Sequence, residues 1–483
     1  MAEANLKSQT KRGIHWTFLN QFINYGLQFI VGIIMARLLT PGDYGITALP
    51  AVFLAIADVF IDGGFGGALV RKPEVSQKDL STAFYYAISV GVFFYIVIFF
   101  AAPLIANYFE TPVLVPLVRV SSLTFLWGPL MTPQNVILKR NLNFKTITRI
   151  SVTTKIIGSA IGVSLAFLGY GLWSLVAMSV ISNLLELIQK WFKVRWLPTE
   201  RWSKESFKYL WGYGNKMMIS GLLDNVYKSI TPIFVGKYFS PADLGIYNRA
   251  LGYAQLPAHQ GTNIIQQVTF PVLSKIQGED EALARNYRRM LQASAFVIFP
   301  IMLMLSALAR PLVILLITDK WESCIILLQI LCFAFMWYPI HAINLNLLQV
   351  KGRSDLFLKL EVYKKIISVV ILFCSLPFGL IYFCIASIFN SMISLFINTY
   401  YTGKLINVSY IDQMKDLLPI WLLSFITWGA IHISFLLIEM AVHSLLINLI
   451  VGSIVGISVY IGFAYLFKMP QLQDVKYMLN LKK

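Results

Sequence analysis

The sequence predicts an all-α membrane protein with many transmembrane helices, arranged as two six-helix lobes followed by two extra helices. Composition is the first reason. Of the 483 residues, 57% are hydrophobic and only 13% are charged, and the mean hydropathy is +0.68. Soluble domains have a smaller fraction of hydrophobic residues and about twice this fraction of charged residues. The spacing of the apolar runs and an internal repeat at an offset of 200 residues are the other two reasons.

Apolar runs of about 20 residues are long enough to cross the hydrocarbon core as helices. Read in order, they predict fourteen spans. These lie near residues 14–38, 43–69, 82–106, 113–138, 147–168, 171–189, 213–239, 243–273, 291–316, 323–349, 356–377, 380–402, 417–437 and 444–467.

Basic residues predict the orientation of these spans, because segments on the cytoplasmic side are enriched in Lys and Arg. With the amino terminus placed in the cytoplasm, the inside segments receive 29 basic residues and the outside turns receive four. This asymmetry explains the net charge of +17 better than a nucleic-acid partner does. We therefore expect both termini in the cytoplasm, short outer turns, and a bacterial inner-membrane location.

The internal repeat relates residues 16–46 to residues 216–246. Thr40-Pro41 and Ser240-Pro241 are each followed by an aspartate, at Asp43 and Asp243. A hydroxyl residue at the N-cap, proline at N1 and an acid at N3 favour a helix start. Each copy is therefore predicted to begin a helix. Because six spans separate the copies, the lobes should be related by a pseudo-two-fold axis along the membrane normal, as in transporters that rock around a shared cavity.

The predicted boundaries follow from the repeat. We expect an amino-terminal lobe at 1–189, a basic, tryptophan-containing amphipathic linker on the cytoplasmic membrane surface at 190–212, and a second lobe at 213–403. The last segment, 404–483, holds the extra helix pair and a cytoplasmic tail.

Ionisable side chains inside the spans are the main functional candidates, since each costs about 2.5–3.5 kcal/mol at mid-membrane and must be paired, hydrated or used. Cations outnumber anions there. A base-rich cavity suits phosphate or pyrophosphate, because guanidinium binds oxyanions in bidentate fashion and ammonium acts as a point charge. Inter-helix salt bridges are the structural alternative. The cations are Arg119, Lys155, Lys216, Lys228, Arg249, Lys364 and Lys365, and the anions are Asp58, Asp62, Glu186, Asp224 and Glu361.

Among these, Lys228 and Arg249 are expected at similar depth, with Lys155 and Arg119 as further substrate-binding candidates. A polar stripe runs along the first helix of each lobe, because residues four apart share a helix face. In the second lobe it consists of Lys216, Ser220, Asp224 and Lys228. In the first lobe the stripe is Asn20, Asn24 and Gln28, whose amides suit sugar hydroxyls. The carboxylates expected to couple transport to an ion are Asp224, Asp58 and Glu186.

Other chemistry finds little support in the sequence. The four cysteines lie in apolar runs without ligand spacing, which predicts buried thiols and no metal site. The five histidines are scattered, and the outer turns are too short for the outer domain expected of a membrane-bound glycan polymerase or acyltransferase. No catalytic residues and no cofactor are predicted, and nucleic acid is not an expected partner.

Two segments resemble a known family. MARLLTPGDYGITALPAVFLAIADVFIDGGFGGALV, beginning at Met35, and GKYFSPADLGIYNRALGYAQLP, beginning at Gly236, are similar to the polysaccharide transporter branch of the multidrug/oligosaccharidyl-lipid/polysaccharide exporter superfamily. The resemblance covers nearly the whole chain. It implies an inner-membrane flippase that moves undecaprenyl-diphosphate-linked oligosaccharide repeat units outward for capsule, O-antigen or exopolysaccharide synthesis.

The resemblance also implies a cationic central cavity, although it does not assign this role to particular residues of the chain. The expected partners are the lipid-linked oligosaccharide, membrane lipid, a proton or sodium ion, and glycan polymerase or assembly machinery. Two relatives of the same superfamily remain as alternatives. One is a cation-coupled multidrug or metabolite antiporter, and the other is a lipid II flippase.

Overall fold

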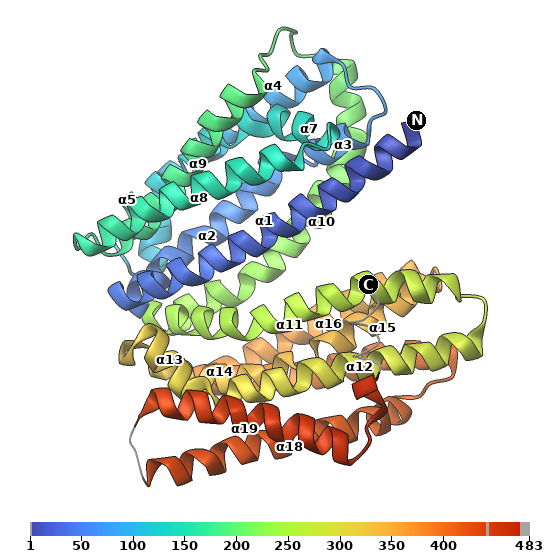
Figure 1. The fold of residues 1–483 in the computed structure, drawn as a ribbon. Coiled ribbons are helices and arrows are strands. Elements are labelled where there is room, and N and C mark those ends of the chain that lie inside the picture. Colours follow the sequence, from blue (N-terminus) through green and yellow to red (C-terminus); the bar gives the residue numbers. More distant parts are fainter. Residues whose placement is uncertain (1, 441–443, 474–483) are drawn as a thin grey trace. The chain divides into compact units, whose positions relative to one another are not determined.

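The computed structural model describes residues 2–440 and 444–473, and every regular element in these ranges is helical. The end of the predicted cytoplasmic tail, from residue 474, lies outside the described residues. The chain divides into two units, one ending at Gly245 and the other beginning at Ile246 (Figure 1). The lobe boundaries predicted above remain a prediction.

The first unit is built from α1 to α10 and the start of α11. Its elements are α1 (Ala2–Leu38), α2 (Pro41–Asp62), α3 (Phe65–Arg71), α4 (Gln77–Tyr108), α5 (Leu114–Ser121), α6 (Thr124–Trp127), α7 (Thr132–Arg140), α8 (Phe144–Phe167), α9 (Leu172–Val194), α10 (Lys204–Tyr238) and α11 (Pro241–Lys275). Helix α1 packs against α8, α8 against α9, and α10 against α2, α3 and α4. The predicted fourth span is therefore divided among α5, α6 and α7.

The second unit contains most of α11 and the remaining helices. They are α12 (Asp280–Ala307), α13 (Ala309–Ile317), α14 (Ser323–Phe335), α15 (Tyr338–Val350), α16 (Ser354–Ser375), α17 (Leu380–Ile406), α18 (Tyr410–Glu439) and α19 (Leu445–Leu466). The extra pair, α18 and α19, packs on α12 and α13. Buried polar groups hold it there, since Gln413 accepts hydrogen bonds from Tyr287 (3.1 Å) and Asn344 (3.3 Å).

The prediction of an all-α polytopic membrane protein is confirmed. In the described ranges, eleven helical segments are long and apolar enough to cross a membrane, and they overlap eleven of the predicted spans. The ninth predicted span, 291–316, differs most, because α12 ends at Ala307 and α13 follows as a separate helix. The other three predicted spans are α10, α11 and α16, which form long helices but carry many charged and amide side chains. Polar helices of this length are found in membranes where they face protein or a water-filled cavity.

Both repeated motifs begin a helix as predicted. The Thr40 hydroxyl accepts a hydrogen bond from the Asp43 backbone N–H (3.2 Å), and the Asp43 carboxylate accepts one from the Thr40 N–H (2.9 Å). Ser240 and Asp243 form the same reciprocal pair at 3.1 Å in each direction. Such capping boxes satisfy backbone donors that the first turn leaves unpaired.

The linker after α9 packs into the first unit. Trp196 is 8% exposed and joins the cluster around Phe65 and Phe84, while its indole N–H donates to Gln77 (2.8 Å). Trp191 donates to the Leu130 carbonyl (3.1 Å). Trp196 therefore fixes the linker to the first unit, and Trp191, near the end of α9, fixes the helix from which the linker leaves.

Contacts between loops agree with the predicted topology. Segments expected inside contact each other, as in the pairs Arg140–Pro73 (2.7 Å) and Arg288–Asp416 (2.6 Å). The outside turns also contact each other, through Lys237 and Glu110 (2.8 Å). This grouping places alternate loops at the same ends of the helices within each unit.

Arg140 should be important for stability. Its guanidinium, at the end of α7, donates to the carbonyls of Leu69 (3.0 Å), Val70 (3.2 Å), Lys72 and Pro73 (2.7 Å), where α3 ends. Positive charge is favourable at a helix C-terminus, and hydrogen bonds from charged groups contribute more than neutral ones. We expect Arg140→Met to lower the free energy of unfolding by about 2–4 kcal/mol.

The measurement is the melting temperature of the purified protein in detergent. Lys139→Met is the matched control, because Lys139 is the exposed neighbour on the same helix and makes none of these bonds. Equal melting temperatures for the two variants would contradict the proposed role of Arg140.

Candidate functional site

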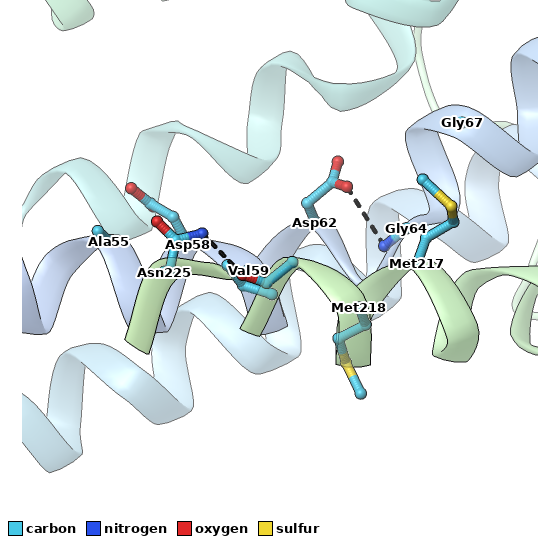
Figure 2. Close-up of a pocket in the computed structure, with 10 residues that line it drawn as sticks. Ala55, Asp58, Val59, Asp62, Gly64, Gly67, Met217, Met218 and Asn225 are labelled. Carbon is cyan, nitrogen blue, oxygen red and sulfur yellow. Dashed lines mark hydrogen bonds between the residues drawn. The ribbon is translucent and has the colours of Figure 1, made fainter. Parts of the chain in front are cut away.

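A pocket of about 520 Å³ lies between α2–α3 and α10 in the first unit (Figure 2). Its polar side chains are two carboxylates, one helical turn apart on α2, and one amide on α10. Apolar side chains and glycines complete the lining. The ten lining residues are Ala55, Asp58, Val59, Asp62, Gly64, Gly67, Met217, Met218, Gly221 and Asn225.

Glycines position one end of this pocket. Helix α2 ends at Asp62, and Gly63 and Gly64 follow it with left-handed φ angles of +54° and +71°, which favour glycine. Asp62 stabilises the turn by accepting a hydrogen bond from the Gly64 N–H (3.2 Å). A Cβ on Gly64 would lie 2.5 Å from the Gly214 carbonyl oxygen, so α10 approaches this turn at backbone contact.

Asp58 differs from the other intramembrane acids of the first unit. Within the described part of the chain, its side chain makes no hydrogen bond or ion pair, and it is exposed to the pocket. The inter-helix salt bridge considered from the sequence is therefore not formed at Asp58. Its role in ion coupling remains a prediction. Glu186, by contrast, pairs with buried Lys190 on its own helix.

The predicted amide stripe on α1 faces α8. Asn24 donates to the Asn20 side chain (2.7 Å) and to the Ser151 hydroxyl on α8 (3.4 Å). Lys155 lies one turn beyond Ser151 and is exposed, with no ion pair among the described residues. Gln28 continues the stripe one turn beyond Asn24. The structure therefore brings Asn20, Asn24 and Lys155 to one region of the first unit.

The predicted cation pair is divided between the two units. Lys228 forms an ion pair with Asp224 one turn earlier on α10 (2.7 Å), and its side chain remains 69% exposed. Arg249 belongs to the second unit, where its guanidinium lies over the rings of Trp321 (5.2 Å) and Tyr253 (5.8 Å). Proximity of Lys228 to Arg249 stays a prediction.

Arg119 is engaged in packing. Its guanidinium lies 4.1 Å from the centre of the Phe99 ring, and its Nε donates to the Phe99 carbonyl (3.2 Å). A cation–π contact and a backbone hydrogen bond satisfy this charge within the first unit. Among the four cations predicted to bind substrate, Arg119 is therefore the one whose contacts best fit a role in packing.

Sequence reasoning identified Asp62 as an intramembrane acid but did not assign it to a site, and it missed Asn225. The four-residue spacing of Asp58 and Asp62 indicated a shared face of α2. No local signal placed Asn225 opposite that face, because the packing of α10 on α2 is a tertiary contact. Glycines at 63, 64, 214 and 221 were the available sign of close helix approach.

The two copies of the repeat meet at the end of the first unit that is predicted to lie outside. A Cβ on Gly45 would lie 1.5 Å from the Pro241 carbonyl oxygen, and a Cβ on Gly245 would lie 2.0 Å from that of Pro41. The contact is symmetric, as a pseudo-two-fold axis requires. Nearby, Lys237 bonds to Glu110 (2.8 Å) and to the Tyr108 carbonyl (2.6 Å), which holds the pKa of the Glu110 carboxyl below its usual value.

Residues 34–326 match the model of a family described as "Polysaccharide biosynthesis protein". Among curated proteins, the chain is 22% identical to the teichuronic acid biosynthesis protein TuaB of Bacillus subtilis, over 73% of both chains. It is 24% identical to the lipopolysaccharide biosynthesis protein WzxC of Escherichia coli, over 74% of both. It is 25% identical to the succinoglycan biosynthesis transport protein ExoT of Rhizobium meliloti, over 66% of this chain and 64% of that protein.

Solved structures share the fold. The lipid II flippase MurJ in an inward closed conformation aligns with a TM-score of 0.72 and 17% identity, covering 93% of this chain and 98% of that one. An inward-facing multidrug resistance transporter of the MATE family aligns with a TM-score of 0.59 and 15% identity, covering 79% and 95%. Both similarities concern the fold alone.

Proposed function

Because the chain belongs to the polysaccharide biosynthesis protein family, we propose that it is a flippase for lipid-linked oligosaccharide repeat units used in surface polysaccharide synthesis. The observation that carries the proposal is the family match over most of the chain, combined with a polytopic transporter fold. The names of three relatives refer to teichuronic acid, lipopolysaccharide and succinoglycan, and one of them is called a transport protein. Their common element is a surface glycan.

The proposed substrate is an undecaprenyl-diphosphate-linked repeat unit for capsule, O-antigen or exopolysaccharide. It has three chemical parts, and the chain offers groups suited to each. Exposed cations at Lys228 and Lys155 suit the diphosphate, with Arg249 contributed by the second unit. Amides at Asn20, Asn24 and Gln28 suit sugar hydroxyls, and the prenyl tail remains in lipid.

The proposed mechanism is alternating access between the two predicted lobes. The substrate enters from the cytoplasmic leaflet, and the lobes rock to present the glycan outside. No covalent bond is made or broken, so the activity is transport and not catalysis. Asp58, Asp224 and Glu186 are the candidates for coupling to a proton or sodium gradient. Of these, Asp58 is the one that makes no ion pair among the described residues.

We also propose a bacterial inner-membrane location with both termini in the cytoplasm. The asymmetry of basic residues supports this orientation, and the contacts between loops agree with the grouping. Partners of the proposed activity are membrane lipid and the glycan polymerase or assembly machinery that receives the flipped unit.

The test is flipping of a fluorescent lipid-linked oligosaccharide in proteoliposomes, read as accessibility to a membrane-impermeant quencher. We expect wild-type protein to flip it. We expect Lys228→Ala together with Arg249→Ala to slow flipping at least about tenfold, since each lost charge-assisted hydrogen bond is worth more than 1.4 kcal/mol.

Lys320→Ala, in an outer turn, is the control for loss of a positive charge. Wild-type protein without flipping activity would contradict the proposed function. Full activity in the double variant would contradict only the assignment of the two cations.

A cation-coupled antiporter is the second candidate, favoured by the carboxylate of Asp58, which lines the pocket and has no partner among the residues that the structure describes. Carboxylates of this kind suit cationic substrates. Dye efflux from cells under an imposed ion gradient distinguishes the two functions, because the flippase proposal predicts no efflux. A lipid II flippase would instead show activity with a peptide-bearing disaccharide lipid in the same proteoliposome assay.

A further inference from the structure

The pocket between α2 and α10 presents hydrogen-bond acceptors to its interior. Asp58 has both carboxylate oxygens unpaired among the described residues, and Asp62 uses one oxygen on the Gly64 N–H. One N–H of the Asn225 amide donates to the Gly221 carbonyl (3.0 Å), and the amide oxygen, which accepts no hydrogen bond from the described residues, is a further acceptor at the pocket (Figure 2). An occupant that donates several hydrogen bonds is therefore favoured, because ionised carboxylates only accept.

The size and charge of the pocket further restrict which molecules it can bind. About 520 Å³ is in the range of small-molecule pockets, far larger than a bare ion needs. Two carboxylates repel a phosphate group. Ala55, Val59 and the two methionines at 217 and 218 supply apolar walls. Sugar rings combine donating hydroxyls with apolar C–H faces, and they match both parts of this lining.

Helix α10 connects this pocket to the predicted phosphate site. Asn225 and Lys228 are three residues apart, so they lie on one face of the helix with a separation of about 4.5 Å along its axis. Lys228 is not among the residues that line the pocket, but it follows the lining residue Asn225 by less than one turn, and its side chain is 69% exposed. A diphosphate held at Lys228 would therefore leave its attached sugar at the level of Asn225.

We propose that the pocket of Asp58, Asp62 and Asn225 is a glycan subsite, which binds hydroxyl groups of the sugar attached to the lipid diphosphate. This inference rests on the proposed flippase function and deepens it. The chain then separates two tasks, because cations recognise the diphosphate common to all such lipids and the acidic pocket recognises the sugar. Substrate selectivity is assigned to α2 and α10.

The test measures binding of three synthetic short-chain prenyl diphosphates to the full-length protein in detergent. One carries a hexose with free hydroxyls, one carries the same hexose fully O-methylated, and one carries no sugar. We expect wild-type protein to bind the free hexose lipid at least about tenfold more tightly than the other two, since hydrogen bonds to charged acceptors are the stronger ones.

The test variant carries both Asp58→Asn and Asp62→Asn. The single variant Asp58→Asn is measured as well, so that the test remains possible if the double variant does not fold. We expect both to reduce the preference for the free hexose lipid while affinity for the sugar-free lipid is unchanged or increased. Glu74→Gln, which removes an exposed acid from an inner loop, should keep the wild-type preference.

Each other outcome overturns the inference in a distinguishable way. If wild-type protein bound all three lipids equally, the glycan subsite would be contradicted and the proposed flippase function would not. If the folded variants kept the preference for the free hexose lipid, the sugar would be bound at another site in the protein. Variants that change only the sodium or pH dependence of binding identify an ion site. Wild-type protein that binds none of the lipids contradicts the proposed function itself.

Discussion

Gly45→Ala should greatly reduce both the stability and the flipping activity of the protein. The added Cβ would lie 1.5 Å from the backbone oxygen of Pro241, and the equivalent change at Gly245 would bring a Cβ within 2.0 Å of the Pro41 oxygen. Neither obstacle is a flexible side chain, so the helix starts must move apart. Overpacking of this kind costs about 1–3 kcal/mol or more. Because the contact joins the two repeats, its displacement should also disturb their relative movement.

The measurement combines the melting temperature in detergent with flipping in proteoliposomes. Gly42→Ala is the matched control in the same helix, because its Cβ would have its nearest contact at 3.7 Å, on the Thr40 hydroxyl. We expect this control to resemble wild type. If Gly45→Ala and Gly245→Ala also resembled wild type, the outer contact would have no role in stability or transport.

A covalent bridge between positions 110 and 237 should stop flipping. Glu110 belongs to the first predicted lobe and Lys237 to the second, and an ion pair of 2.8 Å joins them at the end predicted to lie outside. Alternating access requires this end to open when the glycan is presented outside. A short, reducible bis-thiosulfonate reagent that joins Glu110→Cys to Lys237→Cys should therefore lower flipping to the liposome background, and a reductant should restore it.

The native cysteines permit this design. Cys324, Cys332 and Cys384 are buried, so only exposed Cys374 needs replacement by serine. Each single-cysteine variant treated with the same reagent controls for labelling alone. Unchanged flipping by the bridged protein would show that this end does not separate during transport. The ion pair would then be an exposed surface contact, and such contacts contribute about 0–1 kcal/mol.

Local sequence patterns were sufficient for much of the fold. The capping signals at Thr40 and Ser240 predicted helix starts, and the structure confirms both. A serine with an aspartate three residues later, without the proline, also occurs at Ser76 and Ser409, and each forms a capping box. These are interactions within one turn of chain, so neighbouring residues alone decide them.

The intramembrane charges show where local patterns are insufficient. Lys228, Arg119 and Glu186 appear equivalent in a sequence, since each is a single ionisable group in an apolar run. The structure separates them into an exposed ion pair, a cation on an aromatic ring, and an acid paired with buried Lys190. Each outcome depends on which side chains lie around the group. That is a property of helix packing and not of helix formation.

The sequence by itself determined the membrane class, most of the helical spans and the repeat, because hydrophobic length and capping chemistry act along the chain. The sidedness of the loops, inferred from charge asymmetry, stays a prediction. Only the tertiary structure decided that Asp58, Asp62 and Asn225 share a pocket, and that Gly45 meets Gly245. The reason is that α2 is far in sequence from both α10 and α11. Their closest approaches depend on where glycines allow two backbones to touch.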